Sequence, residues 1–316
     1  MSIDLALAYP PRWLDSPPAL PQDRPFGRQE ALDLGASDKL LMQLTASGYL
    51  RHPVRGAYHV PQLEDGLGLR LACLALLVPE DAVVTDRSAA WLFGAPMALA
   101  PNDHLVVPRV SIFRPPGYRL RNKISASGER TFSDLDLAEM GGLRVTTPLR
   151  TACDLGRLLH RDQAFAGMDA VVRAAGLQVA RVVDEVERFR GYRHVRQLRA
   201  LAPWVDGRSE SPGESILRLR WLDCARLPPP TPQLEVPGRW GPLFLDLGVW
   251  RPRYAAEYDG TEWHGPERHV SDRERREWLR REAGFVIDVF RAADIHGRTQ
   301  NAEARLLQGF ERASAR

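Results

Sequence analysis

A regular pattern of apolar and polar positions begins near Phe26, after a stretch rich in proline. Two short helical periods follow, one from Arg28 to a stop at Gly35, and one after Ser37 with leucines on a single face. Segments 49–51 and 56–60 then alternate as strands, with the residues HPVR between them. The pattern predicts an irregular arm over 1–25 and a helix, helix and hairpin over 26–60.

The middle of the chain, residues 61–204, has a mixed α/β pattern. Helical periods occur in GLRLACLALLV, in DRSAAWLFG and from Pro148 onward, and strand-like runs occur in DHLVVPRV and GLRVTT. No spacing typical of a catalytic site stands out in this region. We expect it to act as a scaffold, a linker or a partner-binding segment.

Glycine, serine and proline cluster in VDGRSESPGES, which indicates a domain boundary near residue 205. After it, the pattern predicts a helix from Glu214, the three strands PQLEV, LFLDLGVW and YAAEY, a helix over SDRERREWLRREAG, the strand FVIDVF and a last helix. The chain is therefore expected to be an α/β multidomain protein whose last domain, 205–316, has the order α-β-β-β-α-β.

Acidic side chains gather on two neighbouring strands of this domain. Glu257 and Asp259 lie two positions apart, so they project from one face of a strand about 7 Å apart, and Asp246 lies on the strand before them. Three converging carboxylates suit Mg²⁺ or Mn²⁺, and such an ion can activate water against a phosphodiester. The alternative is a solvated strand end with a turn at Asp259-Gly260.

Bulk composition limits the classes of protein without selecting one. Apolar residues make up 44% and charged residues 26% of 316 residues, as in ordinary globular chains. No apolar run reaches the length of a membrane span, and the start of the chain lacks a signal-peptide pattern, so we expect a cytoplasmic protein with no membrane contact. The three cysteines form no close pair, which argues against structural zinc and disulfides.

The C-terminal pattern FLDLGVW, YAAEYDGTEWH and D..R resembles the PD-(D/E)xK nuclease superfamily, and more narrowly the domain of unknown function 559 group, relatives of the very-short-patch-repair endonucleases. The resemblance implies a restriction-endonuclease-like fold over about 206–316. It also implies catalytic and metal-binding roles for Asp246, Glu257 and Asp259. The superfamily usually places lysine where this chain has Asp259, and His264 is the residue expected to do that work. Further support is expected from four residues, namely Glu214, Gln233, Asp272 and Arg276.

The order helix, helix, hairpin in residues 26–60 is that of a winged helix, which binds DNA. Lys39 and Gln43 would then face bases, while Arg51 and Arg55 would contact phosphates. Arg273 is expected to hold the backbone of DNA at the C-terminal site. The alternative is a small packing module with no role in DNA binding.

The same N-terminal stretch, together with DRSAAWLFG and RVTTPLRTACDLGR, resembles the AbiEi-type antitoxins, which are transcriptional repressors of toxin–antitoxin pairs. This resemblance covers about residues 26–160 and makes the middle region antitoxin-like. It implies DNA as a partner, with a toxin, an operator or a second copy of the chain as further partners to consider.

Three functional hypotheses follow. The first is a Mg²⁺-dependent DNA endonuclease whose winged helix grips the duplex. The second is an antitoxin-like transcriptional regulator with a catalytically inactive nuclease fold. The third is a partner-binding protein in which both modules have lost their original roles.

Overall fold

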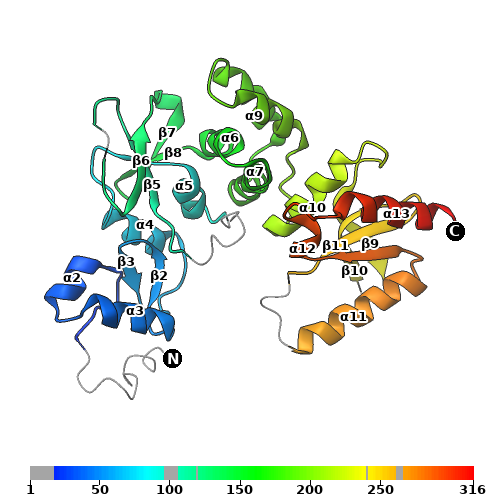
Figure 1. Ribbon diagram of the computed structural model, residues 1–316, viewed down its shortest axis with the longest axis horizontal. Helices are drawn as coiled ribbons and strands as arrows, with labels where there is room; N and C mark the ends of the chain where they lie inside the picture. Colours follow the sequence, from blue (N-terminus) through cyan, green and yellow to red (C-terminus); the bar gives the residue numbers. More distant parts are fainter. Residues whose placement is uncertain (1–17, 96–105, 119, 240, 261–265) are drawn as a thin grey trace. The chain divides into compact units, whose positions relative to one another are not determined.

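A computed structural model describes residues 18–95, 106–118, 120–239, 241–260 and 266–316, and within 266–273 it describes the backbone alone. The chain forms two compact units (Figure 1), of which the first comprises Met1–Ala95 and Asn102–Thr151 and the second comprises Pro96–Pro101 and Ala152–Arg316. Each unit combines helices with sheet, so the mixed α/β class is confirmed. Within the described ranges, no helix is both long and apolar enough to cross a membrane.

Unit 1 begins with two helices and a small sheet. The elements are β1 (Phe26–Gly27), α2 (Arg28–Asp33), α3 (Asp38–Ala46), β2 (Arg51–Val54) and β3 (Ala57–His59), with strand order β1-β3-β2. The side chain of Ser37 accepts a hydrogen bond from the backbone of Leu40, as expected of a helix cap. Leu41 and Leu44 of α3 are buried in the core of this module.

The hairpin in this module differs from the prediction. The residues HPVR, expected to form the turn, belong to β2, apart from Arg55, and the turn is made by Arg55 and Gly56. Two features explain the difference. Pro53 is tolerated because β2 is an edge strand, and Gly56 takes the left-handed conformation (φ 97°) that the turn requires.

A five-stranded sheet forms the rest of unit 1, with the order β6-β5-β4-β8-β7. Its strands are β4 (Val83–Val84), β5 (Val110–Arg114), β6 (Ser125–Glu129), β7 (Leu137–Met140) and β8 (Leu143–Thr146), accompanied by α4 (Leu67–Ala75), α5 (Asp86–Leu92) and η2 (Asp134–Asp136). The strand expected in DHLVVPRV begins only at its last residue, and β6 and β7 were not predicted. Neither of these strands carries the apolar alternation that marks a half-buried strand.

The helix α6 (Pro148–Leu158) contains the division between the units. Unit 2 continues with α7 (Arg161–Ala175), α8 (Val179–Glu185), η3 (Val186–Phe189), α9 (Val195–Leu201), η4 (Ala202–Trp204) and α10 (Pro212–Asp223).

The boundary expected near residue 205 falls inside unit 2, because α7 packs on α10. A buried ion pair joins the two helices, with Arg218 of α10 lying 2.5 Å from Asp169 of α7. Arg218 also donates to the carbonyl of Trp204 and lies over the ring of Phe165 at 4.5 Å.

The last part of unit 2 has the element order expected from the sequence. It contains β9 (Thr231–Gly238), β10 (Gly241–Val249), β11 (Tyr254–Tyr258), α11 (Pro266–Arg281), β12 (Val286–Phe290), α12 (Ala292–Ile295) and α13 (Ala302–Ser314). The sheet order is β12-β11-β10-β9, and only β11 and β12 pair in parallel among these strands. Helices α10 and α13 cover one face and α11 covers the other (Figure 1), through Trp221 and Leu306 on one side and Leu279 on the other.

Loss of the buried cation between α7 and α10 should strongly destabilise unit 2. In an Arg218→Met variant the Asp169 carboxylate would stay buried without its cation, so the free energy of unfolding should fall by about 3–5 kcal/mol. Arg199→Met is the matched control, because its ion pair with Glu187 is exposed and should contribute less than about 1 kcal/mol. Urea denaturation measures both changes, and similar losses in the two variants would contradict the role of the buried pair.

Candidate functional site

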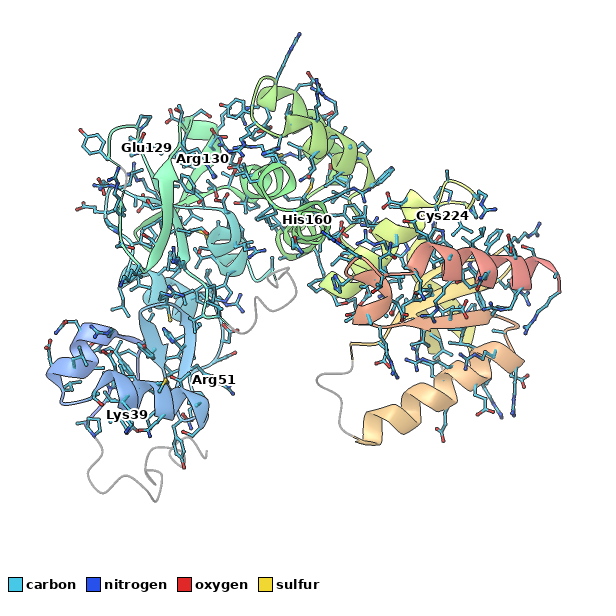
Figure 2. All side chains as sticks on the ribbon, in the orientation of Figure 1. Lys39, Arg51, Glu129, Arg130, His160 and Cys224 are labelled. Atoms are coloured by element: carbon cyan, nitrogen blue, oxygen red, sulfur yellow. The ribbon has the colours of Figure 1, made fainter. Side chains whose placement is uncertain are left out.

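The N-terminal module presents polar and basic side chains on α3. Lys39 and Gln43 are exposed and lie four residues apart, so they share one face of the helix, and Met42 of the same turn is 66% exposed. Arg51 is exposed at the start of β2 (Figure 2). Three of the four predicted DNA-contacting side chains of this module are therefore accessible to a ligand.

The fourth, Arg55, is partly committed within the protein. It is half-buried, its backbone N–H donates to the carbonyl of Pro108, and its Nη1 donates to the carbonyl of Lys123 at 3.2 Å. In the same hairpin, the ring of His52 stacks on Tyr58. Burial, and then the charge of Arg55, lower the pKa of His52 to about 4. His52 is therefore neutral at neutral pH, and the charge of the hairpin comes from its arginines.

The predicted carboxylates of the C-terminal domain lie across adjacent strands. Leu247 of β10 pairs with Ala256 of β11 on one side and with Pro232 of β9 on the other. One residue along, these registers place Asp246 of β10 between Glu257 of β11 and Gln233 of β9. Gln233 donates to the carboxylate of Glu214 at 3.0 Å, which brings the start of α10 to the same place. The structure thus brings together Glu214, Gln233, Asp246 and Glu257.

Glu257 is 2% exposed and is held by two arginines of α11. Arg275 donates to one carboxylate oxygen at 2.7 Å and Arg276 donates to the other at 2.5 Å. A second nitrogen of Arg275 donates to the carbonyl of Phe244 on β10, which fixes its position. Each oxygen of Glu257 therefore already has a cationic partner.

Asp246 and Glu214 have no such guanidinium partner in direct contact in the described part of the chain. Burial, then the charges of Glu214 and Glu257, raise the pKa of Asp246 to about 8, while the N–H of Tyr258 donates to it at 2.8 Å. Burial also raises the pKa of Glu214, which accepts hydrogen bonds from Ser211 and from the backbone of Glu210. With a pKa of about 8, the Asp246 carboxyl keeps its proton at neutral pH, so a cation could join the site only by displacing that proton.

Asp259 lies just beyond β11, and its described contacts are with Phe290 and Arg291. Its backbone N–H donates to the carbonyl of Phe290, and its carboxylate is 3.7 Å from Arg291. His264 lies outside the described residues, and the side chains of Asp272 and Arg273 on α11 lie outside them as well.

The arrangement of carboxylates does not by itself form a metal site. Among the described side chains, no group of three His, Cys, Asp or Glu residues lies close enough to hold an ion. Asp246 and the neighbouring Glu214 carry the carboxylate oxygens that Mg²⁺ prefers as ligands. Glu257 could bind an ion only after releasing Arg275 or Arg276. The donor set as it stands does not fit the ion, and the metal site stays a prediction.

Arg275 is the member of the site that sequence reasoning missed. The spacing of the resembling nucleases selected Arg276, and adjacent residues on a helix rarely serve one partner. Five arginines within the stretch 272–282 give no indication of which two reach Glu257. Only the packing of α11 against the sheet resolves this.

In metal-free protein, the part of the free energy of unfolding that depends on Asp246 should fall as the pH rises from about 4 to 8. The pKa of Asp246 is higher in the folded chain than its ordinary value, so the contribution is complete below about pH 4 and is lost as the pH passes 8. Asp246→Asn removes the buried charge and should flatten this dependence, with a gain on the order of 2–4 kcal/mol in the free energy of unfolding at pH 9.

Urea denaturation in the presence of a chelator measures this effect. Glu235→Gln, an exposed position on β9, is the matched control and should keep the pH dependence of the natural chain. Equal slopes for the natural chain and Asp246→Asn would contradict the burial of an uncompensated carboxylate.

Comparison with known proteins adds two findings. The family described as "AbiEi antitoxin C-terminal domain" matches residues 82–204. "Uncharacterized protein MT2308" and "Uncharacterized protein Rv2248", from two strains of Mycobacterium tuberculosis, are each 30% identical over 258 residues, which cover 81% of this chain and 90% of each relative. The chain belongs to the family of these mycobacterial proteins, and its residues 82–204 are similar to the AbiEi antitoxin C-terminal domain.

Proposed function

We propose that this protein is a DNA-binding regulator of the AbiEi antitoxin type. The observation that carries the proposal is the match of residues 82–204 to the AbiEi antitoxin C-terminal domain, directly after a module with the element order of a winged helix. In this arrangement the N-terminal module selects the DNA and the following domain carries the antitoxin function. A toxin, encoded beside the regulator, is the protein partner that this function requires.

The exposed side chains of the N-terminal module support DNA binding. A helix that inserts into the major groove must present polar side chains able to reach base edges, and Lys39 and Gln43 of α3 are placed for that. The hairpin that follows carries Arg51 and Arg55, whose charges suit phosphates at the edge of the groove. Because Arg55 already donates to Lys123, Arg51 is the stronger phosphate contact of the two.

The C-terminal domain supports regulation better than cutting. In a metal-dependent nuclease the acid of the third strand must be free to bind the ion, whereas both oxygens of Glu257 are paired with guanidinium groups. In a domain that keeps the fold without cutting, Arg275 and Arg276 would stabilise the buried charge of Glu257. This is the arrangement expected of a nuclease-like fold retained for structure or binding.

Binding to the promoter of its own gene should depend on the N-terminal module. Lys39→Ala should weaken binding about tenfold, and Arg51→Gln should lower the slope of log affinity against log salt by about one, because one phosphate contact is lost. Electrophoretic shifts or fluorescence anisotropy at several salt concentrations measure both effects. Arg226→Gln, an exposed arginine after α10, is the matched control and should leave binding unchanged.

The proposal fails if the purified protein binds no DNA at low salt. It also fails if Lys39→Ala and Arg51→Gln bind as tightly as the control variant.

A metal-dependent DNA endonuclease is the second candidate. The observation that favours it is the register that places Gln233, Asp246 and Glu257 side by side on three strands, with Glu214 close to Asp246. A buried carboxylate beside two others is stabilised when a cation joins it. For this function Glu257 would have to exchange at least one of its arginines for the ion before any hydrolysis.

An incubation with plasmid, linear and nicked DNA distinguishes the two candidates. If the protein is a nuclease, cutting should occur with Mg²⁺ or Mn²⁺, stop with a chelator and fall by at least about a hundredfold in Asp246→Asn. Glu235→Gln should cut like the natural chain. Absence of cutting on all three substrates would remove the nuclease candidate and leave the regulator proposal intact.

A further inference from the structure

Unit 1 contains a hollow of about 600 Å³ at the β5–β6 edge of its five-stranded sheet. The start of α5 contributes Asp86, β5 contributes Phe113, and the segment that leads into and through β6 contributes Arg121, Asn122 and Ser127. Arg109, just before β5, lies on the rim. This volume is within the range of small-molecule sites, about 300–1,000 Å³.

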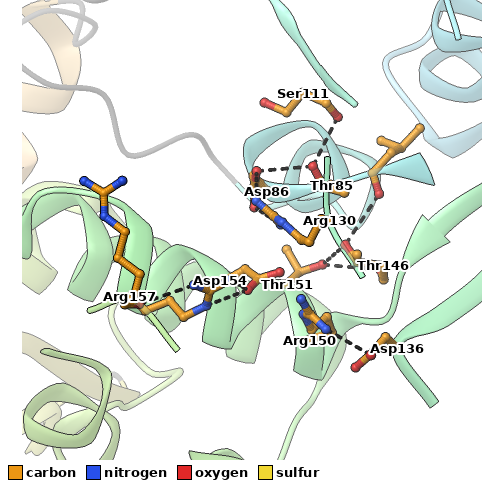
Figure 3. A network of polar contacts seen from close by, with 12 residues as sticks. Thr85, Asp86, Ser111, Arg130, Asp136, Thr146, Arg150, Thr151, Asp154 and Arg157 are labelled. Atoms are coloured by element: carbon orange, nitrogen blue, oxygen red, sulfur yellow. Dashed lines mark hydrogen bonds and ion pairs between the residues drawn. The ribbon is translucent and has the colours of Figure 1, made fainter. Parts of the chain in front are cut away.

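The one acidic side chain of this lining is already neutralised. Asp86 pairs with Arg130 through both oxygens, at 2.9 and 3.1 Å (Figure 3), and both side chains are largely buried. The guanidinium of Arg130 also lies 3.9 Å from the centre of the Phe113 ring. Asp86 therefore adds no net negative charge that would repel an anion.

The two basic side chains of the lining have no hydrogen-bond or ion-pair partner among the described residues. Both of them, Arg109 and Arg121, are exposed. With Asp86 neutralised, these arginines give the hollow a net positive charge, which attracts an anionic ligand.

Asn122 offers the hollow a hydrogen-bond donor, because its acceptor oxygen is already used within the chain. The side-chain oxygen of Asn122 accepts from the backbone of Ile124 at 3.0 Å and from the backbone and hydroxyl of Ser125 at 2.7 Å each. Two backbone donors fix this oxygen, so the other end of the amide is the NH₂ group, which forms no hydrogen bond with the described chain. The Ser127 hydroxyl, by contrast, has less than 1 Å² of accessible surface and is not open to a ligand.

The exposed groups without a partner in the described part of the chain are therefore donors, on Arg109, Arg121 and Asn122. A ligand that satisfies them has to be rich in acceptors and negatively charged, and a phosphate group has both properties. Phe113 and Leu120 add apolar surface, and the volume exceeds the need of a phosphate ion alone. We propose that this hollow binds a small phosphate monoester, with a nucleoside monophosphate or a sugar phosphate as the source of the phosphate.

A duplex DNA backbone fits the same donors less well. Its phosphates lie on a convex surface, so they can reach the exposed arginines without filling the hollow or contacting Phe113 and Leu120. A small phosphate compound can enter the hollow, where its phosphate meets the arginines and its organic part packs on Phe113 and Leu120. The proposal goes beyond DNA binding by the N-terminal module, because it assigns a separate effector site to the five-stranded sheet.

Calorimetric titration of the full chain without DNA tests the site. The probes are AMP, ribose 5-phosphate, inorganic phosphate and, as the phosphate-free comparison, adenosine. We expect saturable binding of AMP or ribose 5-phosphate, and little binding of adenosine. The doubly substituted R109Q/R121Q chain should bind at least about tenfold more weakly. Arg144→Gln is the matched control and should bind normally. Arg144 of β8 is exposed and has no partner among the described residues.

An Asn122→Asp variant separates binding from folding. It keeps the oxygen that accepts from Ile124 and Ser125 and replaces the NH₂ donor by a negative oxygen, so the melting temperature should change little, while affinity for the phosphate compound falls several-fold. The proposal is overturned if no phosphate compound binds at about 5 mM, or if R109Q/R121Q binds the bound compound normally. It is also overturned if these substitutions weaken only the binding of duplex DNA, measured in a parallel titration.

Discussion

Asp136, Asp154, Asp169 and Glu257 are almost fully buried, and each forms an ion pair with at least one arginine. Arg150 and Arg157 provide the cations on α6 (Figure 3), Arg218 provides one on α10, and α11 provides two. A carboxylate taken out of water is costly unless a cation and hydrogen bonds replace its hydration. The folding of both units therefore depends on pairing buried acids with guanidinium groups.

Composition makes this device available to the chain. Lys39 and Lys123 are its only lysines, and the other 41 basic residues are arginines. The planar guanidinium can serve a carboxylate and a backbone carbonyl at once, as Arg218 does for Asp169 and Trp204. Through such contacts one side chain can join several elements, which explains why α7 belongs to the same unit as α10.

Local pattern predicted much of the fold, and it failed where the decisive contacts are long-range. The apolar spacing of α3 and the strand YAAEY were sufficient to place these elements. The boundary near residue 205 followed composition, whereas the packing of α7 on α10 depends on residues 49 positions apart. In the hairpin, the proline of HPVR suggested a turn, because the sequence does not show that β2 lies at the edge of its sheet.

The acid cluster shows the same limit within the candidate site. Strand spacing placed Asp246 and Glu257 together, and the registers of β9, β10 and β11 agree with that placement. Of the two arginines that bind Glu257, Arg276 was expected from the resemblance, whereas Arg275 was beyond prediction, because its reach depends on how α11 lies on the sheet. The two candidate sites also differ in charge. At Asp246 three carboxyl groups share two arginines, and Asp246, with its raised pKa, keeps its proton at neutral pH, so a cation can join only by displacing that proton. The hollow beside β6 instead has two arginines without partners among the described residues, and Arg130 neutralises its one acidic side chain, Asp86, so this hollow favours an anion.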